Sequence, residues 1–214
     1  MERHRRMILC DIGNSRMHLY DGESVIHCSH EEGIARYGER DDLFFICVNE
    51  AVRREIEARN LPWTDLSDRH LLETEYAGLG IDREAACLGV VEGVVIDAGS
   101  AITVDVMERG RHLGGWIWPG IRAMLESYRN ISEKLAVSLN PEVSLDRLPL
   151  DTRDALSFAI LAPVKALVER YAPGKRVVVT GGDATIVAKV LPGAEIDEKV
   201  VFEGMKKLIK DNEC

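Results

Sequence analysis

The feature that most constrains the fold of this chain is a corner that occurs twice, each time at the end of an apolar strand. Residues 11–14 read Asp-Ile-Gly-Asn after the apolar run 7–10, and residues 97–100 read Asp-Ala-Gly-Ser after the run 94–96. Each corner is followed by an alternating segment, a tight turn and a second strand-like segment, which is the pattern of a β-hairpin. Because strand, corner and hairpin recur in the same order, the sequence predicts two related halves.

The remainder of each half alternates between strand and helix patterns. We expect strands at residues 43–48, 63–66 and 176–180, and helices at residues 50–59, 82–90, 121–135, 151–171, 184–190 and 200–209. Pro163 is expected to bend or break the helix at 151–171, because proline removes a helical hydrogen bond. The predicted fold is α/β, with two lobes of β-β-β-α-β-α type, residues 1–91 and 92–214, and a cleft between them.

Composition limits the partners of such a chain. It has 214 residues, of which 46% are hydrophobic, enough for two lobes of about 100 residues each. The formal net charge of −9 leaves no basic face for a nucleic-acid backbone, and the apolar runs are too short to span a bilayer. We therefore expect neither nucleic acid nor a membrane as a partner. Five cysteines without close spacing are expected to be reduced thiols, and residues 1–6 to be a short tail of a cytoplasmic protein rather than a secretion signal.

The two corners have a use in binding phosphate. Glycine lets the backbone approach an anion without a Cβ in the way, and the amides and hydroxyls that follow can face phosphate oxygens. A carboxylate at the end of the strand can hold a hydrated cation that neutralises those oxygens. A third glycine site, Gly181-Gly182, follows the buried strand 176–180. Two corners that face each other across a cleft would hold the phosphate chain of a nucleotide from both sides.

Paired strand-end corners of this kind resemble those of the actin, Hsp70 and sugar-kinase superfamily, whose two RNase H-like lobes bind ATP. Within that superfamily, the chain from residue 7 onwards resembles the type III pantothenate kinases. The motifs of that family occur here in order: Asp-Ile-Gly-Asn-Ser at 11–15, Gly-Ile-Asp-Arg at 80–83, Asp-Ala-Gly-Ser-Ala at 97–101, Gly-Gly-Trp-Ile-Trp-Pro-Gly at 114–120 and Thr-Gly-Gly at 180–182. The second and fourth motifs are the most specific, because the sugar kinases of the superfamily do not usually combine them.

The residues at 80–83 suit the transfer of a phosphoryl group to an alcohol. A carboxylate can orient or accept the proton of the hydroxyl, and an arginine can neutralise the transferring oxygens. The resemblance implies that Asp82 is the proton acceptor. It also implies that pantothenate is bound by Tyr76, Gly80, Ile81, Asp82, Arg83 and Thr152. From the residues alone, two alternatives stay open: Asp82 only caps its helix, and Asp151 or Thr152 only caps the helix at 151–171.

On the ATP side, the resemblance implies contacts from both corners and from the C-terminal glycine pair. The residues implied are Asp11, Ile12, Gly13, Asn14, Ser15, Arg16, Ser100, Gly181 and Gly182. Asp11 would hold Mg²⁺ through phosphate or water, and Asp97 would hold a monovalent cation, K⁺ or NH₄⁺. Ser15 and Ser100 stand where the family usually has threonine, a change that keeps the hydroxyl and is expected to alter affinity rather than abolish activity.

The resemblance therefore implies ATP-dependent phosphorylation of pantothenate to 4′-phosphopantothenate, the first step of coenzyme A biosynthesis, by a homodimer. Two other interpretations stay open, a kinase for another small alcohol and an ATP-binding accessory or regulatory protein. Trp116 and Trp118 are expected to pack internally or to contact another subunit, and His18, His27 and His112 are expected to have no catalytic role.

Overall fold

The computed structural model describes residues 7–210; the tail expected at residues 1–6 and Cys214 lie outside them. The chain divides into two compact units. The first contains Met1–Val91, Gly110–His112 and Glu198–Cys214, and the second contains Glu92–Arg109 and Leu113–Asp197. Each unit has its own sheet and its own apolar core.

A five-stranded sheet is the centre of the first unit. Its strands are β1 (Ile8–Ile12), β2 (Met17–Tyr20), β3 (Val25–Cys28), β4 (Leu43–Cys47) and β5 (Thr64–Asp65), in the order β3-β2-β1-β4-β5. The first three strands are antiparallel neighbours, as the hairpin pattern predicts, whereas β4 runs parallel to β1 and β5 parallel to β4. Parallel neighbours need a crossover connection, and helices supply it here.

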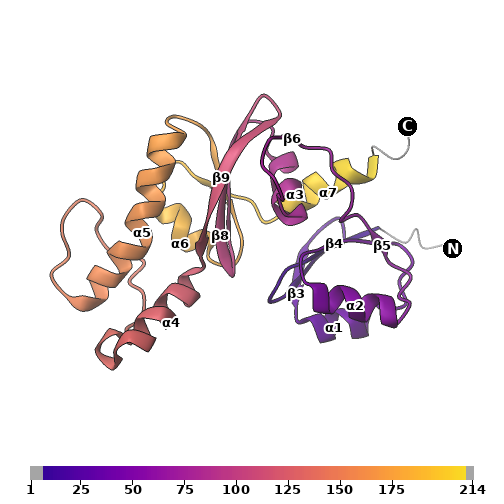
Figure 1. Ribbon diagram of the computed structural model, residues 1–214, viewed down its shortest axis with the longest axis horizontal. Coiled ribbons are helices and arrows are strands. Elements are labelled where there is room, and N and C mark those ends of the chain that lie inside the picture. Colours follow the sequence, from indigo (N-terminus) through magenta and orange to yellow (C-terminus); the bar gives the residue numbers. More distant parts are fainter. Residues whose placement is uncertain (1–6, 211–214) are drawn as a thin grey trace. The chain divides into compact units, whose positions relative to one another are not determined.

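Helices cover both faces of this sheet (Figure 1). α1 (His30–Tyr37) and α2 (Glu50–Ala58) cover one face, where their residues Ile34 and Ile56 join Cys10 and Met17 in the buried cluster. On the other face, α3 (Ile81–Gly89) contacts β4, and α7 (Val200–Lys210) contacts β1. The ring of Phe202 in α7 stacks on that of Tyr20, with centroids 5.4 Å apart. The strand β1 is therefore buried on both sides up to its carboxyl end.

The helix α1 is absent from the sequence-based prediction, although a local signal marks its start. Ser29 caps it by accepting a hydrogen bond from the amide of Glu32, and the Glu32 carboxylate accepts one from the amide of Ser29. This reciprocal capping box has the spacing Ser-x-x-Glu, which is visible in the sequence. Only two residues of the helix, Gly33 and Ile34, are buried, so its apolar periodicity is too weak to be noticed.

The sheet that forms the second unit has the same plan. Its strands are β7 (Gly93–Ala98), β8 (Ala101–Glu108), β9 (Arg111–Pro119), β10 (Val177–Thr180) and β11 (Glu195–Ile196), in the order β9-β8-β7-β10-β11. β8 is antiparallel to β7, whereas β10 is parallel to β7 and β11 to β10. At the outer edge, the short strand β6 (Glu73–Thr74) of the first unit pairs in parallel with Arg111 and His112, the first residues of β9.

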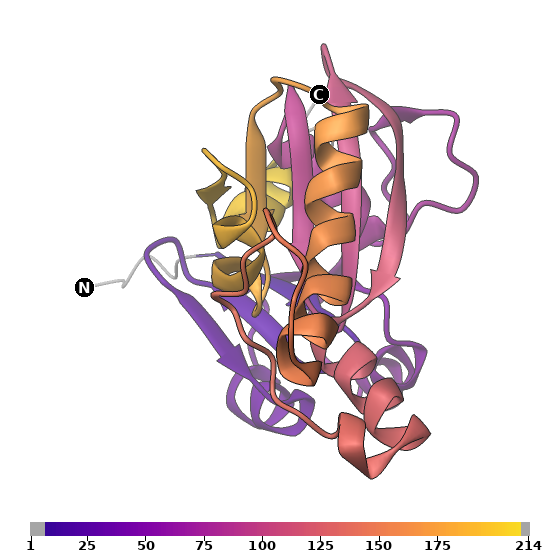
Figure 2. The ribbon, with the colours of Figure 1, turned by 90° about the vertical axis from the view of Figure 1, so that its left-hand side faces the viewer.

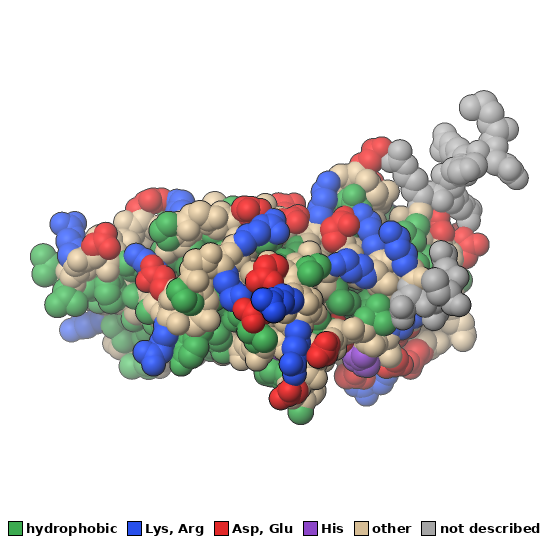
Figure 3. Space-filling model, turned by 90° about the horizontal axis from the view of Figure 1, so that it is seen from above, with side chains coloured by type: hydrophobic (Ala, Val, Ile, Leu, Met, Phe, Trp, Pro, Cys, Tyr) green, Lys and Arg blue, Asp and Glu red, His purple; other side chains and the backbone are tan. Residues whose placement is uncertain are grey.

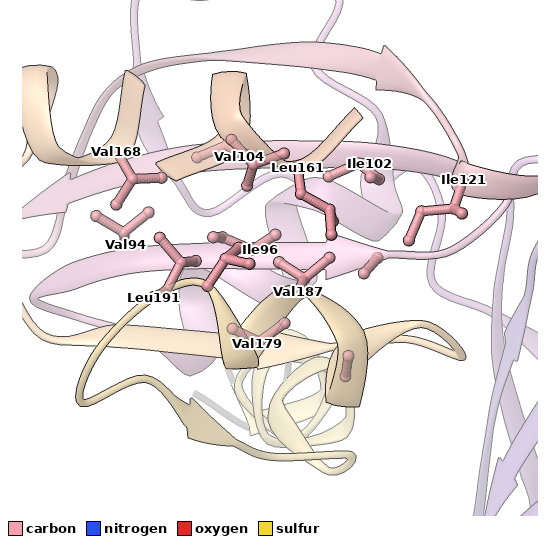
Figure 4. Packing of buried hydrophobic residues seen from close by; sticks show 14 of the residues in the cluster. Val94, Ile96, Ile102, Val104, Ile121, Leu161, Val168, Val179, Val187 and Leu191 are labelled. Carbon is pink, nitrogen blue, oxygen red and sulfur yellow. The ribbon is translucent and has the colours of Figure 1, made fainter. Parts of the chain in front are cut away.

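The core of the second unit lies between one face of its sheet and three helices, α4 (Ile121–Ile131), α5 (Thr152–Tyr171) and α6 (Ala184–Lys189). Figure 2 shows α5 running along the strands. In the close view of Figure 4, alternate residues of β7 and β8 face α5 and α6. This packing joins Val94, Ile96, Ile102 and Val104 of the strands to Leu161, Val168 and Val187 of the helices. A 3-10 turn, Glu133–Leu135, follows α4.

Of the two effects expected for Pro163, a bend or a break of the helix at 151–171, the break is wrong, because α5 is continuous over 20 residues; the bend stays a prediction. The missing hydrogen bond is offset by burial on both sides of the proline, since Ile160, Leu161 and Val164 are each at most 2% exposed. Along residues 7–210, neither α5 nor any other helix combines the length and apolar character that crossing a bilayer requires.

The two sheets repeat one arrangement, with two antiparallel strands on one side of the Asp-bearing strand and two parallel strands on the other. This is what an internal duplication predicts. The lobe boundaries 1–91 and 92–214 stay a prediction, and the compact units assign α7 from the C-terminal half to the first unit, where it packs on α3.

The contact between α3 and α7 depends on glycine. A Cβ at Gly204 would overlap the backbone carbonyl of Ala85, and a Cβ at Gly89 would overlap that of Val200. The two backbones thus approach more closely than any side chain allows. Gly204 in the middle of α7 costs helix stability, about 1 kcal/mol relative to alanine, and this close approach explains why glycine stands there.

We predict that Gly204→Ala lowers the free energy of unfolding of the first unit by about 1–3 kcal/mol, despite its better helix propensity, because the added methyl group separates α7 from α3. Urea unfolding followed by circular dichroism measures the change. Glu203→Ala on the exposed side of the same helix is the control, with an expected change within about 0.5 kcal/mol. Equal stability of the two variants would show that the helices have room to move apart.

Candidate functional site

The first corner, residues 11–16, follows the carboxyl end of β1 and is tied down by its backbone. The amide of Gly13 donates to the carbonyl of Arg16 at 3.1 Å, and His30 Nε2 donates to the carbonyl of Gly13 at 3.0 Å. Asn49, which caps α2, donates through Nδ2 to the carbonyl of Asn14 at 3.2 Å. Ile12 is buried, whereas Asn14, Ser15 and Arg16 are exposed. The corner is thus a fixed loop whose polar side chains remain open to a ligand.

The second corner gathers parts that are far apart in the sequence. Asp97 at the end of β7 lies directly opposite Thr180 at the end of β10. Gly181 follows with φ of +91°, and a Cβ there would overlap Asp97 Oδ1 and the carbonyl of Ala98. The amide of Asp183 donates to the carbonyl of Ala98 at 2.9 Å. The carboxylate of Asp97 and the predicted Gly181 therefore lie together at one end of the sheet.

The start of α4 closes the same corner. The amide of Gly120 donates to the carbonyl of Ser100 at 3.0 Å, and a Cβ on Gly120 would overlap the carbonyl oxygens of Gly99 and Ser100. No side chain caps this helix, so its first amides face the neighbourhood of the corner. Ser100 itself is exposed. An exposed hydroxyl, a helix N-terminus and a carboxylate are together suited to holding a phosphate and a cation.

The two corners match in their hydrogen bonds as well as in their sequence. In the first unit, the amide of Val48 after β4 donates to the carbonyl of Ile12, the residue that follows Asp11. In the second unit, the amide of Asp183 after β10 donates to the carbonyl of Ala98, the residue that follows Asp97. In both units, the peptide that follows the aspartate is therefore fixed by a hydrogen bond from the segment that follows the parallel neighbouring strand.

The Gly-Ile-Asp-Arg motif lies at the start of α3 in the first unit. Gly80 is the N-cap and provides no side-chain hydrogen bond. Asp82 Oδ1 accepts from the amide of Arg83 at 2.8 Å, and it occupies the space that a Cβ on Gly80 would need. A half-buried carboxylate thus lies at a helix N-terminus, an environment that favours anions.

Tyr76 and Arg83, both predicted to bind the acceptor, are in contact. The Arg83 guanidinium lies 4.7 Å from the centre of the Tyr76 ring, and Arg83 is only 6% exposed. A cation over an aromatic face in such a buried place is a favourable arrangement. The structure therefore brings together Tyr76, Gly80, Ile81, Asp82 and Arg83.

Thr152 lies elsewhere, as the first residue of α5 in the second unit, and is exposed. The cap of α5 is Asp151, whose carboxylate accepts from the amide of Asp154 at 2.9 Å. Capping is therefore the role of Asp151, and a substrate role for Thr152 stays a prediction.

The predicted site residues thus form separate groups in the two units. Residues 11–16 and 76–83 belong to the first unit, and Asp97, Ser100, Thr152 and residues 181–182 belong to the second. Two hollows on the first unit, one between β3 and α1 and one beside α2, are lined by none of these residues.

Three residues near these groups, Asp183, Glu84 and Thr74, were not predicted from the sequence. Burial raises the pKa of the Asp183 carboxyl, which directly follows the predicted glycine pair. The buried Glu84 and the hydroxyl of Thr74 hold the segment that carries Tyr76. Their position next to the Gly-Gly and Asp-Arg motifs was the only signal available, because ordinary Asp, Glu and Thr residues carry no motif of their own.

Trp116 and Trp118 lie against the core of the second unit, so the packing part of the prediction for them is confirmed. The Trp116 ring also contacts that of Tyr171, with centroids 5.8 Å apart. The four cysteines among residues 7–210 are free thiols, as predicted.

His18 and His27 are direct cross-strand neighbours in β2 and β3, and their Nδ1 atoms are 2.6 Å apart. His18 also lies directly opposite Asp11 in the sheet. Burial, followed by the charges of His27 and Arg16, lowers the pKa of His18 to about 4. The imidazole is therefore neutral at physiological pH.

Known proteins resemble this chain along almost its whole length. The model of the type III pantothenate kinase family matches residues 61–173. The type III pantothenate kinase of Sulfurimonas denitrificans is 39% identical over 207 residues, which cover 95% of this chain and 98% of that protein. The enzyme of the same name from Helicobacter pylori strain 26695 is 36% identical over 206 residues, covering 96% and 92%.

Solved structures agree on the fold. A crystal structure from Campylobacter jejuni, described as a Baf family transcriptional activator, has a TM-score of 0.85 at 37% identity and covers 97% of this chain and 99% of its own. A 2-dehydro-3-deoxygalactonokinase from Sinorhizobium meliloti has a TM-score of 0.64 at 14% identity, with 96% of each chain covered. The predicted α/β fold class is thereby confirmed, and the chain shares its fold with this kinase.

The lowered pKa of His18 predicts a pH dependence of stability. Between pH 6.5, the ordinary value, and about pH 4, the unfolded chain binds a proton that the native chain excludes. The contribution of His18 to the free energy of unfolding therefore has its full value above pH 6.5 and decreases as the pH drops towards 4. Urea unfolding of the native chain and His18→Gln at pH 7 and pH 5 should show a smaller loss in the variant. Equal losses would mean that His18 titrates normally.

We also predict that Gly181→Ala lowers the free energy of unfolding by about 2–4 kcal/mol, because it combines a positive φ with overlap against Asp97 and Ala98. Gly182→Ala is the control for stability, since a Cβ there meets no atom within 4 Å, and its expected change is within about 0.5 kcal/mol. Differential scanning calorimetry of both variants measures the contrast. Similar melting temperatures would rule out the tight placement of Gly181 on Asp97.

Proposed function

Because the chain belongs to the type III pantothenate kinase family, we infer that it transfers a phosphoryl group from ATP to pantothenate and forms 4′-phosphopantothenate, the first step of coenzyme A biosynthesis. The observation that carries this function is the near-complete coverage of relatives that bear this name, at 39% identity over 207 residues. The family's Asp-Arg motif and both phosphate corners are present in the chain.

Asp82 is our candidate for the proton acceptor of the reacting hydroxyl. Phosphoryl transfer needs little covalent help from the protein, so that placing the alcohol and neutralising charge are its main tasks. Asp82 offers a half-buried carboxylate at the start of α3, and the adjoining Arg83 is held under the Tyr76 ring. The N-terminus of this helix, with its partial positive charge, suits the carboxylate of pantothenate. We assign the acceptor contacts to Tyr76, Gly80, Ile81, Asp82, Arg83 and Thr152.

The nucleotide phosphates are proposed to be bound by the two corners. The exposed side chains of Asn14, Ser15 and Arg16 and the amides of the first corner suit one part of the phosphate chain. Ser100, Gly181 and Gly182 of the second corner suit another part of the nucleotide. This assignment explains why an acidic chain uses glycine-rich backbone rather than lysine at these positions.

The cations that the family implies fit the residues present. Oxygen ligands are what Mg²⁺ requires, and Asp11 ends β1 with a half-buried carboxylate. The carboxylate of Asp97 lies close to the carbonyl oxygen of Ala98, since both atoms crowd the position that a Cβ of Gly181 would take, and oxygen ligands of this kind suit a monovalent cation. We therefore propose that Asp11 holds Mg²⁺ through phosphate or water, and that Asp97 holds K⁺ or NH₄⁺. When bound, these cations would neutralise the triphosphate. Asp82 would still accept the proton of the hydroxyl, and Arg83 would still contact the acceptor.

A homodimer in the cytoplasm completes the proposal. Ile131, Leu148 and Leu150 of the second unit are 71%, 80% and 98% exposed, and exposed apolar surface favours a protein partner. The free thiols of the described cysteines suit a reducing compartment.

A regulatory protein is the second candidate, because the similar Campylobacter jejuni structure carries the description of a transcriptional activator. The charge distribution supports the kinase instead. On the face seen in Figure 3, lysine and arginine alternate with aspartate and glutamate and form no basic strip. With a net charge of −9, DNA backbones are poor ligands. The chain also keeps the Asp82–Arg83 pair, which the kinase proposal uses for catalysis.

We predict that the purified chain releases ADP from MgATP only when pantothenate is present, and faster in potassium than in sodium buffer. Asp82→Asn should lower kcat by a factor of about 10²–10⁴, because the hydroxyl then lacks its proton acceptor. Asp41→Asn in an exposed turn is the control and should match the native chain. Turnover on other alcohols alone would indicate a different acceptor, and ATP binding without any turnover would indicate the regulatory protein.

A further inference from the structure

The segment between β5 and α3 is fastened to the rest of the first unit at two points. Its residues 70–72 are held by Glu84 of α3, and its residues 74–76 are held through Thr74. We call residues 70–76 the strap. The strap ends in Tyr76, and Glu84 directly follows Arg83 in α3, so both attachments lie next to the residues assigned to the acceptor.

The first attachment is a buried carboxylate with three donors. Glu84 Oε1 accepts from the amides of Leu71 and Leu72 at 2.6 and 3.0 Å, and Oε2 lies 2.7 Å from His70 Nδ1. The Glu84 side chain is only 4% exposed. A buried charge is tolerated only where hydrogen bonds compensate its lost hydration. These three bonds therefore fix the backbone of the strap to the first turns of α3.

The second attachment acts on Tyr76 itself. Thr74 Oγ1 accepts from the amide of Tyr76 at 3.0 Å and lies 2.7 Å from His112 Nδ1. The ring of His112, which is 2% exposed, lies 5.9 Å from the Tyr76 ring. On another side, the Arg83 guanidinium lies 4.7 Å from the ring centre. Backbone and ring of Tyr76 are thus held by separate partners.

Ion pairs on the solvent side support the same segment. Arg111 Nη2 lies 2.6 Å from Glu75 Oε1, and Arg111 Nε lies 3.4 Å from Glu73 Oε1. These groups are exposed, so their contribution to stability is small. The buried contacts of Thr74 and Glu84 are the ones that decide where the strap lies.

We propose that Thr74 and Glu84 are positioning residues, which fix the strap so that Tyr76 and Arg83 form a rigid wall of the acceptor site. This inference rests on the proposed function. A group already held in its binding geometry loses little conformational freedom when the ligand arrives, which favours affinity. The wall therefore acts on the binding of pantothenate and leaves the binding of ATP unchanged.

Thr74→Val tests the proposal, because valine keeps the shape of threonine and removes the hydroxyl. The loss of the hydroxyl, and with it the contacts to the Tyr76 amide and to His112 Nδ1, should raise KM for pantothenate about three- to tenfold, with KM for ATP and kcat within twofold. A change in KM alone is the mark of lost binding in both ground and transition states. Thr74→Ser, which restores the hydroxyl, should return KM to the native value.

Glu84→Gln is the second variant, and Thr64→Val in β5 and Glu55→Gln on α2 are the matched controls. Glu84→Gln should also raise KM for pantothenate and should accelerate hydrogen exchange at the amides of Leu71 and Leu72. Thr74→Val should accelerate hydrogen exchange at the amide of Tyr76. The controls should leave the kinetic constants and these amides unchanged.

The outcomes separate this inference from the function on which it rests. If the native chain shows no pantothenate-dependent ADP release, the proposed function fails and the positioning role fails with it. If the native chain is active but folded Thr74→Val and Glu84→Gln have the native KM for pantothenate, the positioning role alone is overturned. An equal rise of KM for ATP would also overturn it, because the strap would then affect the whole unit.

Discussion

The structure depends on one arrangement, the parallel pairing of each Asp-bearing strand with the strand that follows it in space. β1 pairs with β4 and β7 with β10, and in both pairs the carboxyl ends meet at the same edge. The amide after the partner strand then bonds to the peptide that follows the aspartate. Because parallel neighbours must be joined by a crossover, helices lie near each corner. The cap residue of α2, Asn49, bonds to the first corner, and the cap residue of α4, Gly120, bonds to the second.

Around these corners the chain uses few cationic side chains. Glycines at 120 and 181 let backbone carbonyls and amides approach where any other residue would collide. An acidic protein that binds a polyanion needs positive charge from elsewhere, and cations held by Asp11 and Asp97 would provide it without lysine. The acceptor side differs, since a buried arginine stands there under an aromatic ring. We thus propose that bound cations neutralise charge on the nucleotide side and that an arginine side chain does so on the acceptor side.

Much of this arrangement was predictable from the sequence, because the corners are short motifs and the strands before them are continuous apolar runs. The helices at 50–58, 81–89 and 200–210 followed from periodicity within one or two residues. The parts that escaped depend on contacts distant in sequence. Pro163 suggested a broken helix, but core packing along α5 outweighs the missing hydrogen bond. No local pattern shows that Glu84 accepts from the strap, or that His112 reaches Thr74.

The packing of α7 on α3 makes the first unit discontinuous in the chain. Its sheet is complete by residue 65, yet the face of the sheet that carries Tyr20 of β2 is covered by Phe202. During synthesis, a nascent chain therefore exposes this apolar face until α7 has been made. A fragment that stops at residue 91 would keep that face open to other chains, because the helix that covers it lies more than 100 residues later in the sequence.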